Sequence, residues 1–350
     1  MKKFFLPFIF TLAALPVFGQ GIDFRDITVD QAIAEAKSGN KYVFVDVYTD
    51  WCGPCKMMDA QIFPLKEIGD YFNPKYVSIK FNAERGEEGP AFANKYGVKA
   101  YPTFLIIDGN GELVHMFAGG ILDLTFIDKV EQSFDPAKAF GALKKRYDAG
   151  ERDPRFVASY LEALQNTHTA EIGPMIEEFY NSTSDDDKIC SECLFIFDAY
   201  ARVGSEKDEF LTEHRDRFRE AAGRKEVDEV FKRKYVAYFG MILQGYDPGA
   251  TEESIGKAAE RLASLGLQDA GVFPVYEAAA VTKVTGEGAD KVAGMIKDIA
   301  PSLSDNDKNT LLYYTVIGLK NVFSKEQTDE LVALVSNEST KGYIIRSLGR

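Results

Sequence analysis

Hydrophobic and polar positions follow two different patterns along the chain. Up to about residue 134, short runs rich in β-branched and aromatic residues alternate with segments whose hydrophobic positions recur every three to four residues. This alternation predicts an α/β fold in the order β-α-β-α-β-α-β-β-α, with a mostly parallel central sheet and an antiparallel closing hairpin. The clearest strands are expected at 41–49, 75–82, 103–108 and 112–119, and the helices at 29–38, 53–62, 65–72, 89–97 and 124–134.

The pattern changes near Asp135-Pro136. From residue 137 to residue 350, strand patterns are nearly lost and helical periodicity continues between short breaks of Gly, Pro, Asp and Asn. We therefore expect an α/β domain at 22–134, followed by an all-α domain of about ten helices at 137–350, arranged as stacked helix pairs. No fixed repeat length identifies a known repeat family.

The first nineteen residues predict a secretory signal peptide. Lys2 and Lys3 precede an apolar run from Phe4 to Leu15, which Pro16 interrupts before the small residue Gly19. An uncleaved membrane anchor is the alternative, but this run is shorter than the roughly 20 residues that a spanning helix needs. We expect residues 1–19 to be removed, and the mature chain to be periplasmic and not inserted in a membrane.

The net negative charge of the chain indicates which classes of partner to exclude. The formal net charge is −13, and no cluster of Lys and Arg offsets it. Nucleic acids and anionic membrane surfaces carry the same sign of charge, so we expect neither as a partner.

Chemistry is concentrated in two Cys-x-x-Cys pairs, Cys52/Cys55 and Cys190/Cys193. Each pair closes a very small loop, which limits its value as a structural staple. Cys52/Cys55 is therefore a redox pair, a metal half-site or a local disulfide without redox function. A zinc site would need two further ligands, and the Gly-Pro between these cysteines suits a redox loop better, so we expect no metal and no cofactor.

The surroundings of the first pair favour redox chemistry. The predicted strand is followed directly by Cys52-Gly53-Pro54-Cys55, which opens a helix. Unpaired N–H groups at a helix start favour an anion, so Cys52 is suited to act as a thiolate. Cys55 should lie beneath it, more buried, and attack the mixed disulfide that Cys52 forms.

Two segments carry a family resemblance. "VFVDVYTDWCGPCK" at 43–56 resembles the active-site segment of thioredoxins, and "VKAYPTFLIIDGNGELV" at 98–114 resembles their cis-proline strand and hairpin. The resemblance covers roughly residues 22–134 and leaves the helical part unassigned. Within the thioredoxin family, it points to exported thioredoxin-like proteins of Bacteroidetes-type bacteria and to the periplasmic domain of the DsbD reductase.

The resemblance implies roles for the reacting residues. Cys52 would be the nucleophile and Cys55 the resolving cysteine, while Pro102 would form the cis peptide bond that presents backbone to a substrate and keeps metals from the thiols. Tyr101 stands where thioredoxins carry a smaller aliphatic residue, and the 85–89 segment replaces a shorter loop.

It also implies supporting roles. Asp46 would be the buried acid that helps to deprotonate the resolving thiol, and Lys80 the lysine beside it. Trp51 would flank the nucleophile. The alternatives are that Asp46 is an ordinary buried polar residue and that Lys80 is a solvated strand residue.

The second pair lacks these surroundings. Cys190 and Cys193 have acidic neighbours in the sequence, including Asp185 to Asp187 and Glu192, and negative charge raises the pKa of a thiol. We expect a local disulfide here; buried thiols, a relay with Cys52/Cys55 and a metal site are the alternatives.

Together these features predict an exported thiol–disulfide oxidoreductase that reduces protein disulfides through Cys52 and Cys55. Its partners would be disulfide-bonded proteins and a membrane or periplasmic electron donor. Disulfide oxidation or isomerisation is the alternative direction, and a scaffold protein whose helical domain binds clients is the alternative class.

Overall fold

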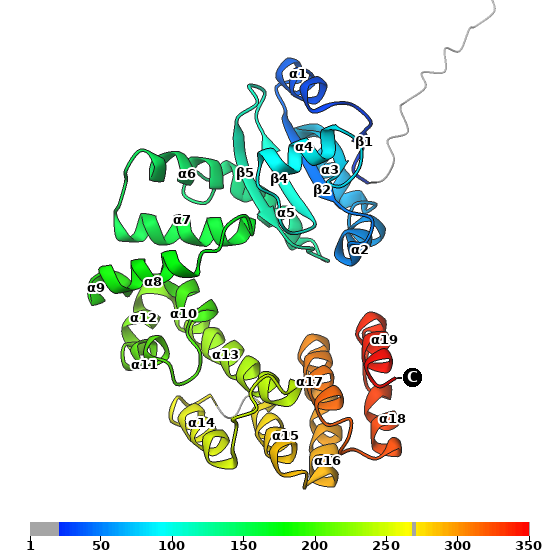
Figure 1. The fold of residues 1–350 in the computed structure, drawn as a ribbon, viewed down its shortest axis with the longest axis vertical. Coiled ribbons are helices and arrows are strands. Elements are labelled where there is room, and N and C mark those ends of the chain that lie inside the picture. The colour runs from blue at the N-terminus through cyan, green and yellow to red at the C-terminus, as the bar shows by residue number, and fades with distance from the viewer. Residues whose placement is uncertain (1–20, 268–270, 350) are drawn as a thin grey trace, which may run out of the picture. The chain divides into compact units, whose positions relative to one another are not determined.

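A computed structural model describes residues 21–267 and 271–349 (Figure 1). The signal peptide predicted at 1–19 lies outside the described residues. The chain forms two compact units, one that ends at Thr183 and one that begins at Ser184.

The first unit is built on a five-stranded sheet in the order β1-β3-β2-β4-β5. β1 and β2 run parallel to β3, whereas β4 runs antiparallel to both β2 and β5. The predicted α/β thioredoxin-like fold is confirmed, but the sheet is mixed rather than mostly parallel, because β4 reverses direction beside β2 as well as beside β5. The strands are β1 (Phe24–Arg25), β2 (Tyr42–Tyr48), β3 (Tyr76–Asn82), β4 (Thr103–Ile107) and β5 (Leu113–Ala118).

Helices of the first unit begin close to the predicted positions. Thr28 caps the first helix as expected, and its side chain accepts a hydrogen bond from the Gln31 N–H in a capping box. The helices are α1 (Val29–Gly39), α2 (Gly53–Gln61), α3 (Lys66–Lys75), α4 (Glu88–Lys95), α5 (Thr125–Glu131), the short η1 (Gln132–Phe134), α6 (Phe140–Asp148), α7 (Pro154–Thr167) and α8 (Gly173–Ser182).

One layer of aromatic residues fixes α2 against the sheet. Phe44 of β2 lies 4.8 Å from Phe72 of α3 and 5.7 Å from Phe104 of β4, measured between ring centroids. Met58 of α2 belongs to the same buried cluster. Burial of large rings is a major favourable term in folding, so this cluster holds the start of α2 at a constant place beside β2.

Three helices beyond the predicted α/β domain belong to the first unit. The strand pattern ends near residue 134, but α6 and α7 pack against β5 and the unit continues to Thr183. The close approach depends on Gly141 of α6, where a Cβ atom would lie 2.0 Å from the carbonyl oxygen of Leu113. The compact unit is therefore longer than the 22–134 domain that the sequence predicts.

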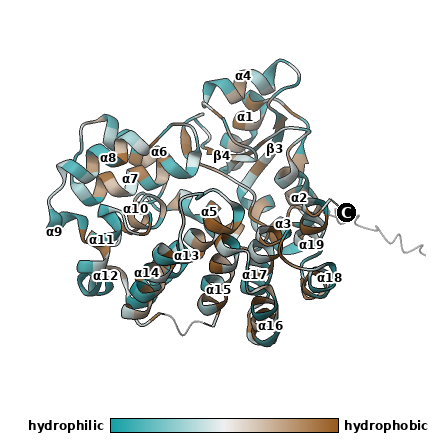
Figure 2. Cartoon of the chain, turned by 60° about the horizontal axis from the view of Figure 1, so that its bottom comes forward, coloured by the Kyte–Doolittle hydropathy of each residue, from teal (hydrophilic) through white to brown (hydrophobic). Residues whose placement is uncertain are grey.

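The second unit is helical in its described residues. Helix α13 packs against both α15 and α17, which also contact each other, and α17 packs against α19 (Figure 1). Helices α14 and α16 pack against α15, and α18 packs against α16, α17 and α19. Helices α9 and α12 are mostly hydrophilic (Figure 2). The helices are α9 (Asp185–Lys188), α10 (Leu194–Ala199), α11 (Glu206–Glu213), α12 (Arg215–Ala222), α13 (Arg224–Gln244), α14 (Glu252–Ser264), α15 (Phe273–Thr285), α16 (Ala289–Ile299), η2 (Ala300–Ser302), α17 (Asp305–Gly318), α18 (Lys325–Ala333) and α19 (Glu338–Ser347).

Within residues 21–267 and 271–349, no helix combines the length and the hydropathy needed to cross a bilayer.

The packing of α6 on β5 gives a testable prediction. Gly141→Ala should lower the free energy of unfolding of the first unit by about 1–3 kcal/mol, because the added methyl group must push the Leu113 backbone away. Urea unfolding followed by Trp51 fluorescence and circular dichroism measures the change. Gly173→Ala is the matched control, since a Cβ atom there meets nothing within 4 Å. Equal stability of the two variants would contradict the packing described.

Candidate active site

The candidate site lies where β2 leads into α2. The strand ends at Tyr48, and Cys52 is the N-cap residue of α2. Cys52 and Cys55 form a disulfide with a Cα–Cα distance of 5.3 Å. The predicted pair is thus closed and stands at a helix N-terminus.

A backbone amide is aimed at the first sulfur. The Cys55 N–H donates a hydrogen bond to Cys52 Sγ over 3.0 Å. When the pair is reduced, the same N–H and the positive end of the helix dipole favour a thiolate at Cys52. This contact supplies the physical basis for a nucleophilic Cys52.

The relative burial of the two cysteines differs from the prediction. Cys52 is 2% exposed and Cys55 is 4% exposed, so the expectation that Cys55 is the more buried residue is wrong. The disulfide and the hydrogen bond from the Cys55 N–H hold the Cys52 sulfur against the first turn of α2. Cys52 and Cys55 are therefore buried to a similar extent.

Two prolines contact the segment that follows β5. The Tyr101–Pro102 peptide bond is cis, as the resemblance implies. The Pro102 carbonyl oxygen accepts a hydrogen bond from the Gly119 N–H at 2.8 Å, and a Cβ atom on Gly120 would lie 3.0 Å from Pro54. At Gly53 a Cβ atom would meet nothing within 4 Å, so space does not require glycine there.

Aromatic side chains form a rim beside the cysteines. Trp51 is 65% exposed, and its ring centroid lies 5.7 Å from that of Tyr101 in an edge-to-face arrangement. The indole Nε1–H donates to the Glu84 carboxylate at 3.0 Å. The Trp51 side chain is therefore accessible to a binding partner, while Glu84 and Tyr101 fix the orientation of its indole ring.

Asp46 is a buried carboxyl group in the middle of β2. It is 2% exposed, and burial raises its pKa to about 7, although Lys80 at 3.6 Å acts in the opposite direction. Its Oδ1 atom has no hydrogen-bond partner among the described residues. A group of this kind can take up or release a proton at neutral pH.

Lys80 joins Asp46 to a second carboxylate. It forms ion pairs with Asp46 and with Asp59 of α2. Its ammonium also lies 5.1 Å from the ring centroid of Tyr48. These contacts give Lys80 a place in the site rather than that of a solvated strand residue.

Three residues of the site were not predicted from the sequence. Glu84, Asp59 and Gly120 are common residue types in a turn, on a helix and in a loop, and only their contacts with Trp51, Lys80 and Pro54 place them here. Glu84 could have been suspected, since it directly precedes the 85–89 segment in which this chain departs from the thioredoxin pattern.

The second pair lies in the second unit, just before α10. Cys190 and Cys193 are buried thiols in the structure, whereas the sequence predicted a local disulfide. Hydrogen bonds from Cys193 lower the pKa of Cys190 despite opposing effects of burial and Glu192, so the expected rise was wrong. Two of the acidic neighbours are neutralised: Lys188 pairs with Asp185, and Arg217 with Asp186.

In the part of the chain that the structure describes, no group of three or more His, Cys, Asp or Glu side chains is placed to hold a metal ion.

Comparison with known proteins adds family information. A family model described as a thioredoxin-like domain matches residues 29–133. A thioredoxin from Chlorobaculum thiosulfatiphilum is 32% identical over 98 residues, which cover 28% of this chain and 84% of that relative. The chloroplastic thioredoxin Y of Oryza sativa is 32% identical over 102 residues, 29% of this chain. The matched region spans only 56% of the length of the latter.

A solved structure is also similar in sequence. The solution structure of a protein from Bacteroides thetaiotaomicron, named as a candidate disulphide-isomerase, is 38% identical. The match covers 33% of this chain and 94% of that chain, with a TM-score of 0.31.

The buried acid gives a prediction with a defined sign. Folding raises the pKa of Asp46 from 3.8 to about 7, so the folded state binds a proton more tightly and stability falls as pH rises through this interval. Asp46→Asn should therefore stabilise the oxidised protein at pH 8 by up to about 4 kcal/mol and much less at pH 4. Urea unfolding at several pH values measures the difference.

An exposed aspartate supplies the control for this experiment. Asp26→Asn removes the same charge from the first unit at an exposed position. Its effect should stay within about 0.5 kcal/mol at every pH. If Asp46→Asn showed the same flat profile, the buried, proton-binding role of Asp46 would be excluded.

Proposed function

The chain belongs to the thioredoxin family, and from this premise we propose that it reduces disulfide bonds of exported proteins through Cys52 and Cys55. The carrying observation is the Cys52–Cys55 disulfide at the start of α2, with the Cys55 N–H directed at the Cys52 sulfur. Family membership and this disulfide support thiol–disulfide oxidoreductase chemistry. The direction of electron flow, the export and the partners are part of the proposal.

The reaction starts from the reduced pair. The Cys52 thiolate attacks one sulfur of the substrate disulfide, and the other substrate sulfur leaves as a thiolate. Cys55 then attacks Cys52 in the mixed disulfide, which closes the Cys52–Cys55 bond and releases the second substrate sulfur. Two electrons pass from the dithiol to the substrate.

Asp46 supplies proton transfer in the second step. The Cys55 thiol must lose its proton before it attacks, and a carboxyl group whose pKa is about 7 can accept that proton at neutral pH. Lys80 stabilises the ionised form of Asp46, since its ammonium lies 3.6 Å from the carboxylate. Asp46, with Lys80 beside it, thus has a pKa suited to accepting a proton at neutral pH.

The rim of the site is suited to contact a polypeptide. Trp51 and Tyr101 present aromatic surface beside the disulfide, and Glu84 holds the indole in place. A large and rigid aromatic surface contributes contact area at low entropic cost.

Reduction is favoured over oxidation by the residues between the cysteines. Gly53-Pro54 is the dipeptide of reducing thioredoxins in the resemblance, whereas oxidants of the DsbA kind carry a histidine there. The sequence pattern of residues 1–19 supports export. An exported reductase needs an electron donor, and a membrane or periplasmic dithiol protein would return the Cys52–Cys55 disulfide to the dithiol.

Trapping of mixed disulfides tests this function. In Cys55→Ser the second attack is impossible, so Cys52 should remain joined to substrate proteins in complexes that a reductant dissolves. Non-reducing electrophoresis and mass spectrometry of cells that produce the variant detect these complexes and identify the substrates.

The double variant Cys52→Ser/Cys55→Ser is the control and should trap nothing. Cys190→Ser/Cys193→Ser, combined with Cys55→Ser, should trap as efficiently as Cys55→Ser alone. If Cys55→Ser formed no complexes, and the wild type with dithiothreitol reduced no model disulfide faster than dithiothreitol alone, the proposed function would be refuted.

A further inference from the structure

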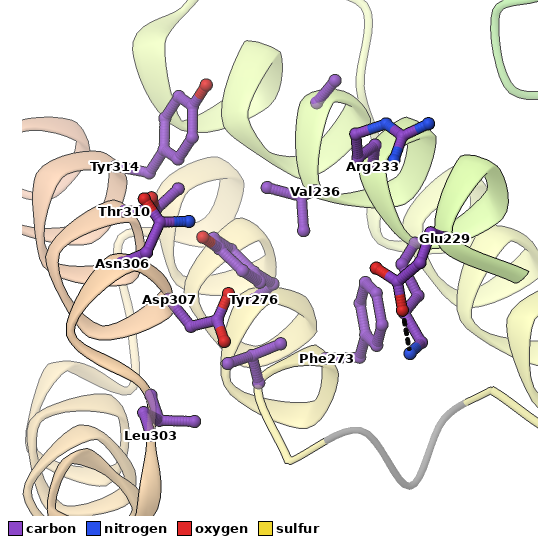
Figure 3. Close-up of a pocket in the computed structure, with 13 residues that line it drawn as sticks. Glu229, Arg233, Val236, Phe273, Tyr276, Leu303, Asn306, Asp307, Thr310 and Tyr314 are labelled. Carbon is purple, nitrogen blue, oxygen red and sulfur yellow. Dashed lines mark hydrogen bonds and ion pairs between the residues drawn. The ribbon is translucent and has the colours of Figure 1, made fainter. Parts of the chain in front are cut away.

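A cavity of about 490 Å³ opens within the second unit, between α13, α15 and α17. Its volume lies in the range of about 300–1,000 Å³ that is common for small-molecule sites. Figure 3 shows Phe273 and Tyr276 of α15 between Glu229 and Val236 of α13 and Asp307 of α17. Aromatic and charged side chains thus face the same space.

Three of the four charged side chains that line the cavity form ion pairs. Lys232 forms an ion pair with Glu229 at 2.7 Å, and Arg233 forms one with Asp198 at 2.7 Å. Asp307, the remaining charged residue of the lining, has no basic partner among the residues that the structure describes. Its carboxylate accepts a hydrogen bond from the Ser304 hydroxyl, and the exposed side chain stands at the mouth of the cavity (Figure 3).

A tyrosine hydroxyl reaches the same cavity. Tyr276 is 2% exposed and lines the space, yet its hydroxyl makes no hydrogen bond with any described residue. Burial, with Tyr314 and Asp307 nearby, raises the pKa of Tyr276, so the hydroxyl stays protonated. The hydroxyl oxygen is therefore available to accept a hydrogen bond from a group bound in the cavity.

We propose that this cavity binds a lysine or arginine side chain of a client polypeptide. The carboxylate of Asp307 attracts the cation, and the partly exposed apolar side chains of Val236 and Leu303 pack against its aliphatic stem. The Tyr276 hydroxyl accepts a hydrogen bond from the same group. The net charge of −13 adds a long-range attraction for basic segments.

The choice of a polypeptide as the ligand rests on the proposed function, in which the substrates are proteins. Recognition of the cation itself rests on the cavity alone. The site would hold a basic segment of a client on the helical unit, apart from the chemistry of the cysteines.

Peptide binding to the oxidised full-length protein tests the proposal. The probe is an acetylated and amidated pentapeptide with arginine at its centre and alanine elsewhere, and its control carries citrulline, the neutral isostere of arginine. Isothermal titration should show at least tenfold tighter binding of the arginine peptide, and this preference should weaken as salt is added. Equal binding of both peptides, or no binding at millimolar concentration, would overturn the proposal.

Two variants locate the binding. Asp307→Asn should weaken binding of the arginine peptide about tenfold, and Tyr276→Phe about threefold, with the citrulline peptide unaffected. Asp298→Asn removes the same charge from α16 outside the cavity and should have little effect. If Asp298→Asn weakened binding as much as Asp307→Asn did, the attraction would be a general surface effect and the site would be refuted.

Failure of this proposal can be told from failure of the proposed function. Binding is measured on the oxidised protein without any redox readout, and disulfide reduction is assayed on the same preparation. A protein that reduces disulfides but does not bind the arginine peptide retains its function and lacks this site.

Discussion

The hydrogen bond from the Cys55 N–H to the Cys52 sulfur is the contact on which the proposed chemistry depends. It exists only because α2 begins immediately after Cys52, and the start of α2 is set by its packing against the sheet. Phe44, Met58 and Phe104 lie in the aromatic cluster that makes this packing. The packing of the core of the first unit therefore also determines the reactivity of Cys52.

A second constraint works against stability. Asp46 occupies a position in β2 that an apolar residue would fill more favourably, since its burial raises the pKa of the carboxyl group to about 7. Lys80 offsets part of that cost and is itself held by Asp59. A group that is unfavourable for folding but able to exchange protons at neutral pH is typical of a functional position.

Much of this could be predicted from the sequence, where local pattern decides structure. The Thr28 cap, the strand that contains Asp46 and the helix that opens at Gly53 all follow from residue type and spacing. Interactions between distant segments could not be predicted in this way. The antiparallel pairing of β4 with β2 depends on the path of the intervening chain, and the contact of Glu84 with Trp51 joins residues that are 33 positions apart.

The pKa of Cys190 and the extent of the first compact unit also depend on contacts that local sequence pattern does not reveal. The acidic neighbours of Cys190 suggested a raised thiol pKa, but ion pairs and the hydrogen bonds from Cys193 reverse that direction. The first unit extends to Thr183 because α6 and α7 cover β5. Helical periodicity shows that these segments are helices, and it does not show what they pack against.

The reduction potential of the Cys52–Cys55 pair tests the central claim most directly. Equilibration with dithiothreitol buffers can be followed through Trp51, the only tryptophan, which directly precedes Cys52. The Cys190→Ser/Cys193→Ser background ensures that only the first pair is observed. The account predicts a value near the roughly −270 mV of thioredoxin, and a value near the roughly −120 mV of DsbA would contradict a reductase.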